Sequence, residues 1–158
     1  MLTIQPNDGY EKYLFERAYD THTPISGTFE LLPTCNMDCR MCYIRISPEE
    51  MRRQGRMLSA GEWLRIGRQA GEAGALFILL TGGEPLLHPE FREIYKGLRA
   101  QGMCVTVNTN GTLITEEIAD MWGSDLPRRI NISLYGSSDE IYGEFCRNPQ
   151  GFTQFMAN

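Results

Sequence analysis

The sequence of 158 residues has no apolar stretch long enough to cross a membrane. Its longest apolar run, residues 75–80, is far shorter than the roughly 20 residues that a spanning helix needs. Residues 1–10 have neither the basic start nor the apolar centre of a secretory signal peptide. We therefore expect a cytoplasmic protein with no membrane partner.

Positive charge is also scarce. Lys and Arg total 15 against 20 for Asp and Glu, which gives a formal net charge of −5 and a pI near 5.1. Because phosphate backbones are bound mainly by clustered positive charge, nucleic acid is not expected as a partner. With 42% hydrophobic and 22% charged residues, the composition is that of a folded globular protein, and the length suits one domain.

Cysteines are few but clustered. Three of the five lie within eight residues, at Cys35, Cys39 and Cys42. In a reducing compartment such a cluster indicates metal or redox chemistry more than disulfides. Three thiolates are one fewer than a closed four-thiolate site requires, so two interpretations stay open. One is an iron–sulfur cluster with one open iron, and the other is a structural zinc site with a fourth ligand from elsewhere.

No candidate for that fourth ligand has the spacing of a zinc ribbon. The candidates are His22, His88, Cys104 and Cys146. We expect Cys104 and Cys146 to be small buried side chains, and His88 to be a loop or helix-entry residue.

Apolar runs and amphipathic stretches alternate along the chain. Strands are predicted at 25–32, 75–81, 103–108 and 129–135, and helices at 59–73, at 89–102, at 115–122, from Ser138 and from Gly151. This order predicts an α/β fold with a parallel sheet, and the near-continuous apolar runs suggest a sheet covered on both faces.

The predicted domains are a leader and a core. Residues 1–24 form an N-terminal leader, rich in aromatics, that is expected to pack across one end of the sheet. Residues 25–158 form the core domain. Four parallel strands do not close a barrel, so we expect this core to be truncated at its C-terminus and, on its own, prone to self-association and poorly active.

A short motif lies at or just after the end of each predicted strand. The motifs are Cys-x-x-x-Cys-x-x-Cys from Cys35, Thr-Gly-Gly-Glu-Pro at 81–85, Thr-Asn-Gly at 109–111 and Ile-Ser-Leu-Tyr-Gly at 132–136. The carboxyl ends of parallel strands are where sites form in such folds. Together the four motifs resemble the radical SAM superfamily, in particular the N-terminal part of SPASM-type members.

The resemblance implies a fold and a chemistry. The fold would be a partial (β/α)6 TIM-like barrel, here with about four βα units. Cys35, Cys39 and Cys42 would ligate a [4Fe–4S] cluster whose fourth iron takes S-adenosylmethionine. Reductive cleavage by an external electron donor would give a 5′-deoxyadenosyl radical, which would abstract hydrogen from a substrate such as a peptide or protein.

The resemblance also implies cofactor contacts. Gly82, Gly83 and Glu84 would flank the methionine amino group, and Asn110 and Ser133 would line or hold the same cavity. Met41 and Tyr43 would lie against the adenine, although the aromatic residue usual before the third cysteine is replaced here by Met41. Two alternatives remain: a structural zinc module, and a non-catalytic, truncated cluster-binding domain. The roles of Cys146 and Arg147 are left open.

Overall fold

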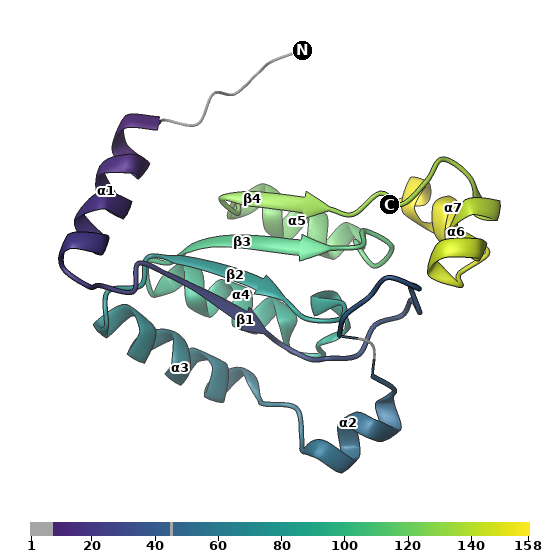
Figure 1. The fold of residues 1–158 in the computed structure, drawn as a ribbon, viewed down its shortest axis with the longest axis horizontal. Coiled ribbons are helices and arrows are strands. Elements are labelled where there is room, and N and C mark those ends of the chain that lie inside the picture. The colour runs from purple at the N-terminus through teal and green to yellow at the C-terminus, as the bar shows by residue number, and fades with distance from the viewer. Residues whose placement is uncertain (1–7, 45) are drawn as a thin grey trace.

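One parallel sheet organises the molecule. The computed structural model describes residues 8–44 and 46–158. Four strands lie side by side in chain order and all run parallel: β1 (Ser26–Glu30), β2 (Phe77–Thr81), β3 (Cys104–Thr109) and β4 (Arg129–Ile132) (Figure 1). The register places Phe29, Leu80, Val107 and Ile130 in one row across the sheet. The predicted α/β fold with four parallel strands, a partial TIM-like barrel, is confirmed.

Three helices connect successive strands and cover one face of the sheet. They are α3 (Ala60–Glu72), α4 (Phe91–Ala100) and α5 (Glu116–Ser124) (Figure 1). Ser59 begins α3 with a capping box, as its spacing to Glu62 predicts. The core lies between these helices and the sheet, and its fully or nearly fully buried side chains include Ile78, Leu80, Ile94, Leu98, Val105 and Val107. Burial of these apolar side chains stabilises the sheet and fixes its register.

Two helix predictions need correction. Helix α4 begins at Phe91, two residues after Pro89, because the Glu90 N–H donates to His88 Nδ1 (3.1 Å) and holds a turn there. Helix α2 (Pro48–Gln54) was not predicted, although Ser47 and Glu50 form a capping box with Pro48 at the first turn. The helices expected from 138 and 151 are α6 (Asp139–Cys146) and α7 (Gly151–Ala157).

The face of the sheet opposite the helices is largely polar. Along β3, Thr106 and Asn108 alternate with the buried Val105 and Val107, and on β4 Asn131 Nδ2 donates to Asn108 Oδ1 (2.8 Å). A cavity of about 450 Å³ lies over this face. The expectation of a sheet with apolar residues on both faces therefore holds only for β2, whose Phe77 and Leu79 line the same cavity. The other strands line it with polar residues such as Thr28, Thr106 and Asn131.

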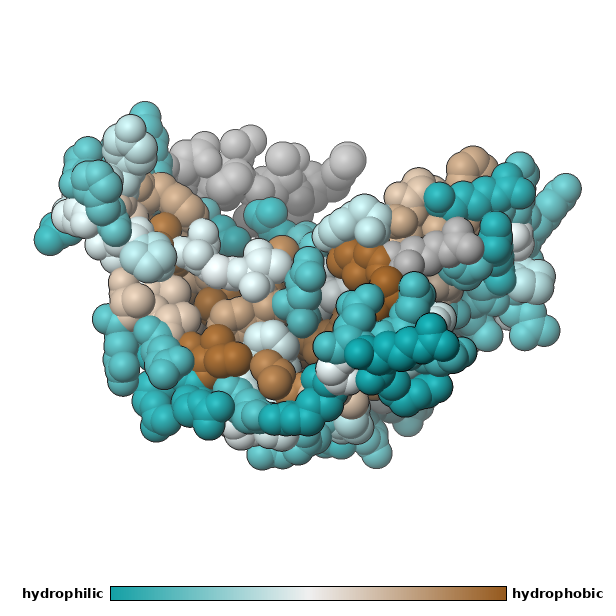
Figure 2. Space-filling model, turned by 60° about the horizontal axis from the view of Figure 1, so that its bottom comes forward, coloured by the Kyte–Doolittle hydropathy of each residue, from teal (hydrophilic) through white to brown (hydrophobic). Residues whose placement is uncertain are grey.

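Helix α1 (Asp8–Asp20) lies across the end where the strands begin (Figure 1). The Phe15 ring stacks on Phe77 with centroids 5.7 Å apart, and Arg128 pairs with Glu11 at 2.6 Å. Helix α1 of the predicted leader therefore packs at one end of the sheet, and residues 1–7 of the leader lie outside the described residues. Figure 2 shows hydrophilic residues around the rim of one face and hydrophobic residues in the hollow between. Among the described residues, no helix has the length and apolar character to span a membrane.

Candidate functional site

The loop that carries the three clustered cysteines follows β1 and faces the ends of the other strands. A cavity of about 350 Å³ lies at this carboxyl edge of the sheet. Its walls include nine of the ten residues predicted from the sequence, namely Cys35, Cys39, Met41, Cys42, Tyr43, Gly82, Gly83, Asn110 and Ser133. The tenth, Glu84, does not line it. Residues from all four strand ends thus meet at one cavity, as expected for parallel strands.

The three thiols differ in exposure. Cys39 is buried, Cys35 is half-buried and Cys42 is exposed. Burial, together with the neighbouring thiols of Cys146 and Cys42, raises the pKa of the Cys39 thiol to about 12. Burial also raises the pKa of Cys35, opposed by the N–H groups of Met37 and Asn110 that point at its sulfur. Such thiols bind a metal only by losing their protons to it, so metal binding here would release protons.

The donor set fits an iron–sulfur cluster. Within residues 8–44 and 46–158, no three His, Cys, Asp or Glu side chains lie close enough to hold one metal ion. A cubane cluster uses each cysteine for a different iron, so its ligands need not meet at one point. Three soft thiolates from one loop, at the wall of a cavity, suit that arrangement better than a mononuclear zinc site.

The two glycines let β2 end against the start of the cysteine loop. A Cβ at Gly82 would collide with the backbone of Leu32, and one at Gly83 with the backbone of Thr34. Gly82 also has φ +142°, which side chains rarely adopt. Gly83 N donates to Leu32 O at 2.8 Å. Gly82 and Gly83 are therefore required because the backbone at the end of β2 lies directly against the backbone that precedes Cys35. This contact fixes the start of the cysteine loop.

Glu84 points into the protein. Its side chain is fully buried, and burial raises the pKa of its carboxyl group. Oε1 accepts from Leu86 N (3.1 Å) and Thr109 Oγ1 (2.8 Å), and Oε2 accepts from Asn110 N (2.8 Å). These bonds tie the end of β2 to the end of β3. The structure therefore does not bring this carboxylate into the cavity that Gly82 and Gly83 line.

Two polar side chains missed by the sequence analysis, Asn36 and Thr112, join the cysteine loop to the segment after β3 through the predicted site residue Asn110. Asn36 Nδ2 donates to Thr112 Oγ1 (2.8 Å), Thr112 Oγ1 donates to Asn110 Oδ1 (2.7 Å), and Asn110 Nδ2 donates to Asn36 Oδ1 (2.8 Å). We call Asn36, Asn110 and Thr112 the amide ring. Nothing in the local sequence signals it, because Asn36 and Thr112 are 76 residues apart.

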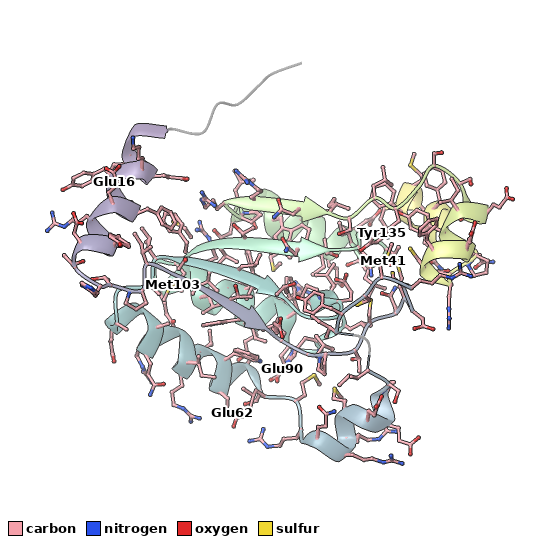
Figure 3. The ribbon with its side chains drawn as sticks, in the orientation of Figure 1. Glu16, Met41, Glu62, Glu90, Met103 and Tyr135 are labelled. Carbon is pink, nitrogen blue, oxygen red and sulfur yellow. The ribbon has the colours of Figure 1, made fainter. Side chains whose placement is uncertain are left out.

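The remaining predicted residues that line the cavity are exposed to solvent. Met41 and Tyr135 lie at the carboxyl end of the sheet beside α6, whereas Met103 lies at the opposite end (Figure 3). Met41 is 55% exposed and Tyr43 is 88% exposed. Ser133 is exposed, and its N–H donates to Thr109 O at 3.0 Å. Tyr135 also lines the cavity and was missed as a site residue, although the Ile-Ser-Leu-Tyr-Gly motif contains it.

The C-terminal end of α6 docks on the cysteine loop. Asp38 N donates to Cys146 O (3.0 Å) and Arg40 N donates to Phe145 O (2.9 Å). Cys146 is fully buried, as expected, and packs with Cys39. Arg147 pairs with Asp38 at 2.8 Å, so the guanidinium holds the loop. Cys104, in contrast, is only half-buried because it begins β3, so its predicted burial is wrong.

The model of the family described as "Radical SAM superfamily" matches residues 29–158. The chain is 30% identical over 132 residues to the antilisterial bacteriocin subtilosin biosynthesis protein AlbA of Bacillus subtilis. The matched residues cover 83% of this chain and 29% of AlbA. It is 36% identical over 116 residues to a probable GTP 3′,8-cyclase of Methanopyrus kandleri, covering 72% of this chain and 35% of that protein.

A solved structure shares the fold. Streptococcus suis SuiB bound to S-adenosylmethionine superposes with a TM-score of 0.68 at 19% identity, over 98% of this chain and 37% of SuiB. The chain spans about a third of the length of these relatives. The cofactors of the matched family are a [4Fe–4S] cluster and S-adenosylmethionine. The family model covers most of the chain, and the four strand-end motifs meet at one cavity. This chain therefore belongs to the radical SAM superfamily of enzymes.

Proposed function

We propose that this chain holds a [4Fe–4S] cluster through Cys35, Cys39 and Cys42 and presents S-adenosylmethionine to it. The observation that carries the proposal is the single cavity that these three cysteines share with Gly82, Gly83, Asn110 and Ser133. When bound and reduced by an external electron donor, the cluster supplies the electron that cleaves S-adenosylmethionine to methionine and a 5′-deoxyadenosyl radical, which takes hydrogen from the substrate.

The protein's own residues orient the cofactor in this proposal. The backbone of Gly82 and Gly83 forms the wall toward the methionine amino group, and Ser133 forms the wall at the end of β4. Met41 and Tyr43 cover the adenine side. Glu84 contributes by holding the segment after β3 in place, because its oxygens are already bonded to Thr109, Asn110 and Leu86.

We further propose a peptide or protein substrate. Asn108 lines both the cysteine cavity and the larger cavity over the polar face of the sheet, so the two are neighbours. Hydrogen-bonding side chains such as Thr28, Thr106 and Asn131 border the larger cavity, and they suit the amide groups of a peptide. AlbA is named for the biosynthesis of a bacteriocin, and SuiB was solved bound to the precursor peptide SuiA. A cytoplasmic location is part of the proposal, because free thiols persist there.

Formation of 5′-deoxyadenosine tests the catalytic claim. The full chain is reconstituted anaerobically with iron and sulfide, reduced with dithionite and mixed with S-adenosylmethionine. We expect 5′-deoxyadenosine from wild type and from Cys104→Ala, and none from Cys42→Ala. A wild-type protein that takes up iron and sulfide but yields no 5′-deoxyadenosine would favour the non-catalytic alternative. One that takes up zinc in place of iron and sulfide would favour the structural alternative.

A further inference from the structure

The side-chain amide of Asn110 is directed at one of the cluster cysteines. Asn110 Nδ2 lies 3.6 Å from Cys35 Sγ, within hydrogen-bonding range for sulfur. The same sulfur accepts the backbone N–H of Met37 at 3.4 Å. Cys35 therefore has two N–H donors, one from its own loop and one from the segment after β3.

The amide ring fixes which way this amide points. Asn110 Oδ1 accepts from Thr112 N (3.0 Å) and Thr112 Oγ1 (2.7 Å), and a backbone N–H can only donate. The oxygen of Asn110 therefore faces Thr112, and the NH₂ group faces Asn36 and Cys35. Asn36 Oδ1 accepts the second of its hydrogens at 2.8 Å.

The backbone of Asn110 is also held. Its N–H donates to Glu84 Oε2 at 2.8 Å, and the residue is only 7% exposed. Glu84 in turn accepts from Thr109 Oγ1, so the buried carboxylate fixes the start of this segment. The donor is thus preorganised before any cluster is present, and it needs no rearrangement to meet a thiolate.

We propose that Asn110 is a positioning residue that donates an N–H···S hydrogen bond to the Cys35 thiolate and so raises the reduction potential of the bound cluster. The proposal rests on the proposed function. An N–H donor stabilises negative charge on sulfur, and the reduced cluster carries one more electron than the oxidised cluster. The bond is therefore stronger in the reduced state, and hydrogen bonds to the sulfurs are among the features that set cluster potentials.

The test is a redox titration of the reconstituted cluster followed by electron paramagnetic resonance. Three variants are compared with wild type: Asn110→Ala removes the donor, Thr112→Val keeps the donor but breaks the amide ring, and Gln101→Ala is a matched control. The side-chain amide of Gln101 donates to Leu64 O (2.9 Å) near the start of β3, at the other end of the sheet from the cysteine loop. Iron and sulfide content is measured for each protein.

With iron and sulfide content unchanged, we expect a more negative midpoint potential for Asn110→Ala. The shift for Thr112→Val should have the same sign and be smaller, and Gln101→Ala should match wild type. An unchanged or more positive potential in Asn110→Ala would overturn the proposal. If Asn110→Ala loses its cluster, the midpoint potential of Thr112→Val is the deciding measurement. A wild-type potential in Thr112→Val would then overturn the proposal. A wild-type chain that binds no cluster would instead refute the proposed function on which the inference rests.

Discussion

Two fully buried regions of this molecule are stabilised in opposite ways. Leu80, on β2, and Glu84, just beyond its end, both have 0% exposure. Leu80 packs among apolar side chains of the helix-covered face, whereas Glu84 is surrounded by donors from the ends of β2 and β3. The first region stabilises the fold through packing. The second fixes the geometry of the site, because a buried polar group is stable only when its partners are in place. Two side chains that are equally buried thus have different roles: Leu80 stabilises the fold, and Glu84 fixes the strand ends that carry the site.

The largest stability effect is expected from the apolar region. Leu80→Ala removes a fully buried side chain from the centre of the core and should lower the free energy of unfolding by about 2–5 kcal/mol. Denaturant unfolding measures this loss. Leu126, which is 71% exposed, is the matched control, and Leu126→Ala should change stability by less than about 0.5 kcal/mol. Equal losses in the two variants would contradict the placement of the core.

A smaller loss is expected from the polar region. In Glu84→Gln, one end of the new amide must be an NH₂ group, but Leu86 N points at one end and Asn110 N at the other. A donor then faces a donor in either orientation, which should cost about 1–3 kcal/mol of stability. Glu93→Gln, at an exposed position of α4, is the control. If Glu84→Gln retained full stability but bound S-adenosylmethionine more weakly, the carboxylate would contact the cofactor directly, as the sequence resemblance implies.

The smallest effect is expected at Glu62, outside both regions. Arg56, with the N–H and hydroxyl of Ser59, holds the pKa of Glu62 well below its ordinary value of 4.5. The carboxylate therefore adds stability above that pH, and this contribution is lost as the pH falls below 4.5 because the unfolded chain takes up the proton first. In unfolding measurements at stepwise lower pH, Glu62→Gln should lose stability less steeply than wild type. Identical pH profiles would show that the ion pair contributes nothing.

The sequence predicted the regions that repeat a local pattern. The strand and helix order followed from apolar periodicity, and the cysteine spacing with the strand-end motifs indicated nine residues that line one cavity. It did not predict the direction of Glu84, because a Gly-Gly-Glu segment is compatible with either orientation. Nor did it predict the amide ring or the docking of α6, since these join segments 74 to 109 residues apart and depend on how the strand ends are aligned.

The central claim is that the three clustered cysteines hold one iron–sulfur cluster, and iron and sulfide analysis after anaerobic reconstitution tests it most directly. Cys39→Ala is compared with Cys104→Ala, which alters a cysteine at the other end of the sheet. We predict that wild type and Cys104→Ala take up the full iron and sulfide content of one [4Fe–4S] cluster per chain and that Cys39→Ala does not. A brown Cys39→Ala protein with the full iron and sulfide content would contradict the account.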